Sequence, residues 1–188
     1  MTTNALNGHQ VALLATHGFE ESELTVPRDA LIQAGATVHI ISVEKGTIQG
    51  FKHLEKGQAI PVDKTLDEVK ADDYDTLMLP GGLYNPDALR TNGDALAFVQ
   101  AFFAAGKPVG AICHAPQILI SAKLVKGRTL TGVKSIQVDL VNAGAIVEDD
   151  EVVVDHGLVT SRTPKDLPAF CKKLVEECAE GYHTGQAA

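Results

Sequence analysis

Short apolar runs alternate with amphipathic runs along most of the chain. The apolar runs are bounded by polar or turn residues, as is typical of strands buried on both faces of a parallel sheet. They cover residues 11–15, 37–43, 76–79 and 109–112. The amphipathic runs predict helices over residues 21–34, 94–105, 115–122 and 135–142. Strands that alternate with helices in this way predict an α/β domain with a mainly parallel sheet.

Two further stretches complete the predicted order of elements. Residues 46–62 are rich in glycine and in short β-type runs, so we expect a group of small strands there. Residues 151–155 and 158–161 predict two strands joined by a tight turn. Thr163 and Pro164 then open a final helix, because a hydroxyl residue followed by proline is a common helix start.

Residues able to do chemistry follow three of the predicted strands. Residues 16–23 follow the first strand and include three glutamates, and the glycine turn 80–82 follows the third. Cys113 and His114 come directly after the strand 109–112. The carboxyl ends of parallel strands meet at one edge of a sheet, where ligand sites form. We therefore expect a thiol, an imidazole, carboxyl groups and backbone amides to converge there.

Length and charge narrow the function classes. The chain has 188 residues, which fits one domain over residues 1–188, with frayed tails expected at 1–8 and 181–188. The formal net charge is −8, which argues against nucleic acid and anionic membrane surfaces as partners. We find neither a signal-peptide pattern nor an apolar run long enough to span a membrane, so we expect a cytoplasmic protein.

The three cysteines need separate interpretations, because three thiols cannot all pair within one chain. Cys171 and Cys178 fall on the apolar stripe of the final helix and are interpreted as small core residues rather than as a metal or redox pair. Cys113 lies at a strand-to-helix junction, where a thiolate is stabilised by the amides of the following helix. A buried, inert thiol is the alternative. The convergence of loops favours a reactive thiol.

Several stretches of the chain together resemble the PfpI family of intracellular proteases and general stress proteins, within the superfamily that includes the Parkinson's-linked deglycase. The likeness spans about residues 9–180, and the cysteine-histidine elbow with the Pro-Gly-Gly turn is its most specific part. The matching stretches include residues 19–24, 79–82, 111–122, 142–144, 151–155, 160–164 and 166–170.

The resemblance implies roles for individual residues. Cys113 is implied as the nucleophile and His114 as its base. Glu23 is implied as a protonated carboxyl beside the thiol, and the amides of Gly82 and His114 as the oxyanion site. In the protease branch a carboxylate from a neighbouring subunit orients the histidine, and Asp87 occupies the matching position here. The family also implies a flavodoxin-like three-layer sandwich and an assembly that is at least a homodimer and extends to a hexamer in some members.

A carboxyl group beside a thiolate needs a physical explanation. An ionised carboxylate raises the pKa of a neighbouring thiol by repulsion, whereas a protonated carboxyl lowers it by donating a hydrogen bond. We therefore hypothesise that Glu23 is neutral and lowers the pKa of Cys113.

The resemblance implies attack of Cys113 on an electrophilic carbonyl, and two functions stay open. The carbonyl is that of a 2-oxoaldehyde or of its early adduct on a protein, which we rank first, or that of a peptide bond. The alternative is a non-enzymatic stress sensor or chaperone, since an accessible thiolate is also oxidised by peroxide. We expect no cofactor and no metal, because phosphate-binding glycine motifs and HExxH are absent from the sequence.

The remaining polar candidates have simpler interpretations. Glu20 and Glu21 are expected as helix-start charges. Arg162 is expected either to bind a substrate carboxylate or to pair with an acidic neighbour. His17 is a candidate to bind substrate or metal, although loop histidines usually do neither, and His156 is expected in an exposed turn. The remaining histidines show no ligand spacing: His9, His39, His53 and His183.

Overall fold

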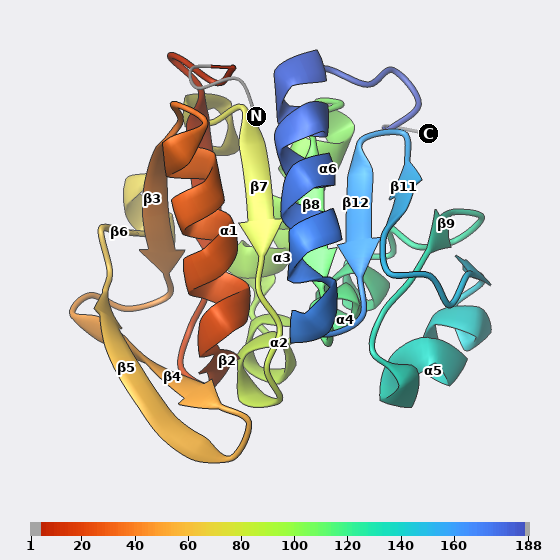
Figure 1. Cartoon of the computed structure of the whole chain (residues 1–188), viewed down its shortest axis with the longest axis horizontal. Coiled ribbons are helices and arrows are strands. Elements are labelled where there is room, and N and C mark those ends of the chain that lie inside the picture. Colours follow the sequence, from red (N-terminus) through yellow and green to blue (C-terminus); the bar gives the residue numbers. More distant parts are fainter. Residues whose placement is uncertain (1–4, 187–188) are drawn as a thin grey trace.

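The computed structural model describes residues 5–186 (Figure 1). The strands are β1 (Gln10–Leu14), β2 (Phe19–Glu20), β3 (Thr37–Ser42), β4 (Thr47–Lys52), β5 (Glu55–Pro61), β6 (Lys64–Thr65), β7 (Thr76–Leu79), β8 (Val109–Ile112), β9 (Thr129–Leu130), β10 (Ile146–Val147), β11 (Val153–Asp155) and β12 (Leu158–Ser161). The α-helices are α1 (Glu21–Gln33), α2 (Tyr84–Leu89), α3 (Gly93–Ala104), α4 (Pro116–Ser121), α5 (Gln137–Asn142) and α6 (Leu167–Glu180).

A seven-stranded sheet forms the centre of the fold. Its strand order is β11-β12-β8-β7-β1-β3-β6, and every pair is parallel except β11 with β12. Because the parallel strands run in one direction, the loops after β1, β7 and β8 leave the same edge of the sheet (Figure 1). The expected flavodoxin-like α/β architecture with a mainly parallel sheet is confirmed.

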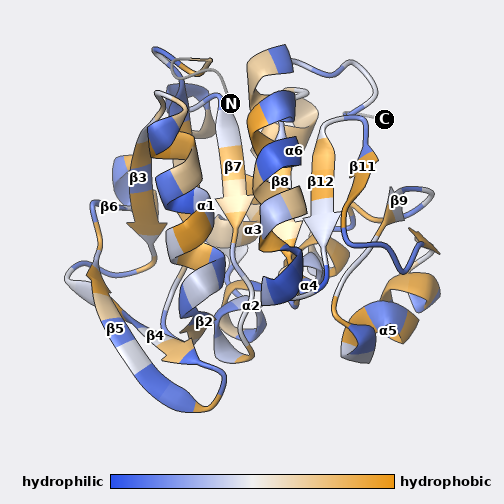
Figure 2. Cartoon of the chain, in the orientation of Figure 1, coloured by the Kyte–Doolittle hydropathy of each residue, from blue (hydrophilic) through white to orange (hydrophobic). Residues whose placement is uncertain are grey.

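The two faces of the sheet are covered by different helices. Along β1, Val11 and Leu13 join a core cluster with α1 and α6, whereas Ala12 and Leu14 join a second cluster with α3 and α4. This division follows from the two-residue period of a strand, which sends successive side chains to opposite faces. The central strands are apolar along much of their length, while β5 is largely hydrophilic and β4 is mixed (Figure 2).

Most predicted elements are confirmed, with boundaries shifted by one to three residues. The excursion at 46–62 is the hairpin β4–β5, and β2 extends it into a small three-stranded sheet. The predicted helix over 135–142 begins as a 3₁₀ turn and becomes α5 only at Gln137. The final helix likewise starts with a 3₁₀ turn at Pro164 before α6. The sequence did not predict β2, α2, β6 or the pair β9–β10.

The expectation of frayed tails stays a prediction, although one residue near each end packs against the fold. Leu6 is fully buried, and its amide donates to the carbonyl of Ala34. At the other end, Gln186 is 1% exposed and accepts a hydrogen bond from Arg128. Residues 1–4 and 187–188 lie outside the described residues.

No helix within residues 5–186 has the length and apolar character that crossing a membrane requires.

Candidate active site

Cys113 sits on a tight backbone turn between β8 and α4. Its φ is +63°, a left-handed conformation that a residue with a side chain adopts at a cost of about 1–2 kcal/mol. Two hydrogen bonds hold the turn: the Cys113 amide donates to Ser161 O at 2.9 Å, and its carbonyl accepts from the Val133 amide at 3.0 Å. The Cys113 side chain is therefore fixed at the carboxyl edge of the sheet and is 9% exposed.

Glu23 lies beside the thiol in the first turn of α1. The residue is fully buried, and its Oε2 accepts a hydrogen bond from the Gly81 amide at 3.0 Å. Gly81 packs tightly between the Glu23 carboxyl and Cys113. A Cβ at this position would lie 2.6 Å from Glu23 Oε2 and 2.8 Å from Cys113 Cβ. Burial raises the pKa of Glu23 to about 8, so the carboxyl is neutral at pH 7, as expected from the sequence.

His114 lies next to the sulfur on the same turn. Its Nδ1 is 3.3 Å from Cys113 Sγ, and its Nε2 is 3.3 Å from Ser135 Oγ. Burial lowers the pKa of the imidazole, which favours the neutral form that accepts a proton. The contact of Ser135 with His114 was not predicted from the sequence, because Ser135 belongs to no recognisable motif.

The glycine turn after β7 and the elbow itself direct backbone amides at the sulfur. The amides of Gly82 and His114 both hydrogen-bond the Cys113 sulfur and lower the pKa of its thiol. Gly82 has a φ of +89°, which glycine adopts without strain. The same two amides are thus available to an oxygen that carries negative charge near the sulfur.

The Cys113 thiol lies in surroundings that oppose its ionisation, and the hypothesis that a protonated Glu23 lowers its pKa stays a prediction. The pKa of Cys113 is raised, first by burial and then by the nearby charge of Glu23 when that carboxyl ionises. The hydrogen bonds from the Gly82 and His114 amides lower the thiol pKa by less than burial raises it. Burial thus favours the protonated thiol, and His114 is the adjacent group placed to accept its proton.

Comparison with known proteins decides the family. A family model described as "DJ-1/PfpI family" matches residues 9–177. The chain belongs to the DJ-1/PfpI family. It is 49% identical over 169 residues to "Protein/nucleic acid deglycase 2" of Escherichia coli K12, covering 88% of this chain and 95% of that one. It is 48% identical over 166 residues to "General stress protein 18" of Bacillus subtilis 168, covering 87% and 94%.

Solved structures of the DJ-1/PfpI family agree with the fold. The crystal structure of Drosophila melanogaster DJ-1beta superposes with a TM-score of 0.83 at 29% identity, covering 91% of this chain and 90% of that chain. A curated relative named as a deglycase supports an enzyme in broad terms.

Asp87 does not reach His114 within the described chain. It lies on α2, and its side chain is exposed. Asn85, two residues before Asp87, is fully buried. Its side chain accepts a hydrogen bond from the Thr16 amide at 2.7 Å and donates one to Pro80 O at 2.8 Å. Asn85 therefore fixes the glycine turn against the loop after β1, a role that its Asn-Pro-Asp context did not reveal. An exposed Asp87 is compatible with the expected contribution to a neighbouring subunit.

The other candidates resolve in favour of structural roles. Arg162 pairs with Asp166 and Asp149, each at 3.1 Å, so the acidic-neighbour interpretation holds. Cys171 and Cys178 are buried in the α1–α6 core cluster, as predicted.

The loop histidine His17 lies near the site but does not contact the thiol. It accepts a hydrogen bond from the Gln49 amide at 3.1 Å and lines a cavity of about 350 Å³ with residues of β3 and α2. Neither Cys113 nor His114 lines this cavity. His17 is thus part of the neighbouring surface and not of the thiol site.

The pKa of Glu23 leads to a prediction for Glu23→Gln. Above pH 8, the ionised Glu23 of the parent opposes loss of the thiol proton, whereas glutamine carries no charge. At pH 9 we expect alkylation of Cys113 by iodoacetamide to be about tenfold faster in Glu23→Gln. At pH 7 the rates should differ little, because the amide N–H replaces the carboxyl O–H as a donor. Mass spectrometry of the Cys113 peptide measures both rates; slower alkylation at both pH values would mean that Glu23 lowers the thiol pKa.

Proposed function

We propose that this chain is a cysteine-dependent enzyme that acts on 2-oxoaldehydes or on their early adducts with proteins. The observation that carries the proposal is the pairing of Cys113 Sγ with His114 Nδ1 at 3.3 Å on a fixed elbow. A neutral imidazole at this distance is suited to accept the thiol proton. A thiol that is only 9% exposed also favours a small carbonyl compound over an extended peptide.

The first chemical step follows from these positions. His114 accepts the proton of Cys113, and the sulfur attacks the aldehyde carbon to form a carbon–sulfur bond. The carbonyl electrons move to the oxygen, which accepts hydrogen bonds from the amides of Gly82 and His114. Glu23 keeps its proton below about pH 8 and therefore adds no negative charge beside the sulfur.

The product then follows from the balance of atoms. A proton shift from the aldehyde carbon to the neighbouring carbonyl carbon gives a thioester, and water cleaves it to a 2-hydroxy acid. The net reaction converts one 2-oxoaldehyde and one water molecule into one 2-hydroxy acid, and it needs no external oxidant or reductant. The names of the deglycase and general stress relatives support this class of chemistry.

We further propose that the active form is a homo-oligomer in the cytoplasm. In a homodimer or hexamer, Asp87 of one subunit would orient His114 of another. The exposed position of Asp87, together with the exposed Leu83 and Tyr84 beside it, supports a contact at α2.

The decisive assay compares three substrates under one set of conditions. Methylglyoxal, a methylglyoxal-treated peptide and an unmodified peptide are each incubated with the purified chain, and consumption and products are followed by chromatography. We expect conversion of methylglyoxal to lactate or repair of the treated peptide, and loss of this activity in Asp87→Ala. Cleavage of only the unmodified peptide would favour a protease, and full activity in Asp87→Ala would refute the cross-subunit contact.

The sensor alternative is tested by the same samples. Mild peroxide should oxidise Cys113 slowly, because burial raises the pKa of the thiol. Rapid oxidation of Cys113 without turnover of any of the three substrates would reject the enzyme in favour of a sensor.

A further inference from the structure

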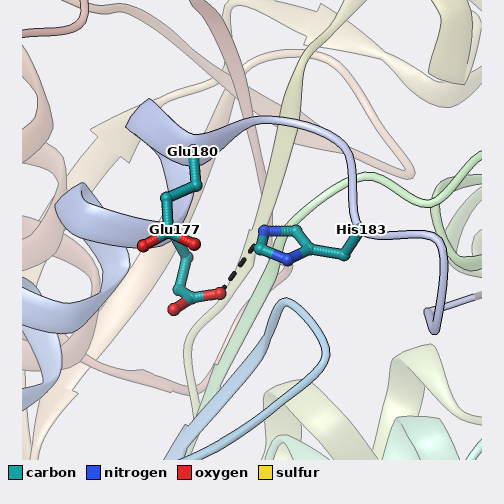
Figure 3. Close-up of side chains that lie close together, drawn as sticks. All are labelled: Glu177, Glu180 and His183. Carbon is teal, nitrogen blue, oxygen red and sulfur yellow. Dashed lines mark ion pairs between the residues drawn. The ribbon is translucent and has the colours of Figure 1, made fainter.

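Three potential metal ligands lie together at the end of α6, away from the thiol site. Glu177, Glu180 and His183 each offer one ligand atom, and these atoms lie within 4.8 Å of one another (Figure 3). His183 contacts Gly106, which precedes β8, and Gly157, which precedes β12. The cluster therefore lies at the edge of the sheet opposite to Cys113, which follows β8. Ligand spacing along the sequence did not predict this cluster, because His183 is brought to the two glutamates only by the fold.

The geometry of the helix end explains the cluster. Glu177 and Glu180 are three residues apart and lie on one face of α6. The chain leaves the helix at Gly181, whose φ of +82° turns it back toward the sheet. His183 is then held by its amide, which donates to Gly106 O at 2.7 Å. Its ring lies so close to Gly157 that a Cβ there would be 2.6 Å from His183 Cδ2.

The segment after α6 is anchored on its far side as well. The Gln186 amide donates to His183 O at 3.0 Å. Arg128 donates to Gln186 Oε1 at 2.9 Å, and Gln186 Nε2 donates to Lys107 O at 3.2 Å. His183 is thus held in position without any ion, so little order has to be gained on binding.

One polar atom in the cluster is buried without a hydrogen-bond partner. It is His183 Nε2, to which no group in the described part of the chain hydrogen-bonds. Glu177 is 8% exposed, and its carboxylate forms an ion pair with the imidazole when His183 is protonated. Lys173, the nearest lysine on the helix, pairs with Glu176 at 2.6 Å. A buried imidazole nitrogen without a hydrogen bond is costly, and a cation held between it and the Glu177 carboxylate would satisfy it.

The separation of these two groups fits a shared metal ion as well as the direct ion pair (Figure 3). Glu177 Oε2 and His183 Nε2 are 3.4 Å apart. Two ligand atoms of a tetrahedral zinc ion are expected to be roughly 3.3 Å apart, given bond lengths of about 2.0–2.1 Å. The carboxyl end of α6 adds its partial negative charge at the same place.

We propose that Glu177, Glu180 and His183 form a binding site for a divalent transition-metal ion, with Zn²⁺ as the best fit. An imidazole ligand disfavours Mg²⁺ and Ca²⁺, which prefer all-oxygen sites. The exposed Glu180 leaves room for water at the remaining position. The bound ion would join α6 to the segment 181–186 and stabilise the folded chain. This inference is independent of the chemistry at Cys113.

The test uses the full chain in a Cys113→Ser background, because the thiol and His114 could also bind zinc. Metal-free protein is titrated with Zn²⁺ by calorimetry, and thermal unfolding is measured with and without the ion. We expect one site whose affinity falls at least ~100-fold in His183→Gln and ~10-fold in Glu180→Gln. Glu176→Gln is the matched control on the same helix and should bind like the parent. Zinc should raise Tm in the parent and the control but not in His183→Gln.

Three results would overturn the proposal. The first is no zinc binding in the Cys113→Ser parent. The second is unchanged affinity in both His183→Gln and Glu180→Gln, which would place the ion elsewhere. The third is Mg²⁺ binding as tight as that of Zn²⁺. If His183→Gln fails to fold, Glu180→Gln decides alone, because its exposed side chain contributes little to packing.

Discussion

Replacing Cys113 with serine should reduce turnover of methylglyoxal by at least ~10³-fold while leaving the fold intact. A serine hydroxyl is far less acidic than a thiol, so a neutral His114 at 3.3 Å cannot generate the nucleophile at neutral pH. The amides of Gly82 and His114 remain in place and account for the residual rate. Steady-state kinetics on the purified variant, with circular dichroism to check folding, give the result.

Cys171→Ala is the matched control for this loss. Cys171 lies on α6, a different element from the elbow, and is buried in the apolar cluster between α1 and α6, of which Cys113 is also a member. We expect turnover within about twofold of the parent and a small loss of stability, of the order of 1 kcal/mol. If Cys113→Ser keeps more than a tenth of the parent rate, Cys113 is not the nucleophile and the proposed reaction is wrong.

The sequence predicts those parts of the site that depend on strand order and local turn chemistry. The buried strands β7 and β8 can be predicted because each is a short apolar run. The parallel sheet then brings the loops that follow them to one edge. Cys113 and the Gly81-Gly82 turn could therefore be assigned to a common site. The family resemblance added Glu23 and the role of His114, which patterns of polarity alone do not provide.

The parts that were missed depend on tertiary contacts. Helix α2 contains a proline and turn-forming residues, and its position depends on Asn85, which hydrogen-bonds the loop after β1. The direction of the Cys113 pKa depends on how deeply the folded chain buries the thiol. His183 meets Glu177 only because Gly181 turns the chain back and Gly106 holds it there. Such contacts join segments that are distant in sequence or irregular in structure. The spacing of apolar residues in these segments is not periodic and therefore does not predict the contacts.

Gly82→Ala should have the largest effect on stability among the substitutions considered. A Cβ at Gly82 would meet backbone atoms: the Gly18 carbonyl oxygen and the Glu20 amide nitrogen, the latter at 2.6 Å. A backbone neighbour cannot rotate away, so the loop after β1 or the glycine turn must move. The φ of +89° adds strain for any residue with a Cβ. We expect a loss of about 3 kcal/mol in the free energy of unfolding.

The same displacement should reduce catalysis, because the Gly82 amide would leave its position beside the sulfur. Loss of one such donor costs about 10²–10³-fold in kcat. Gly127→Ala separates the two causes: Gly127 has a similar φ of +78°, but a Cβ there would meet nothing within 4 Å. It should lose only about 1 kcal/mol and keep full turnover. Urea denaturation and kinetics on both variants measure the difference. Equal destabilisation of the two would mean that backbone strain alone, and not the close approach of the loops, requires glycine at position 82.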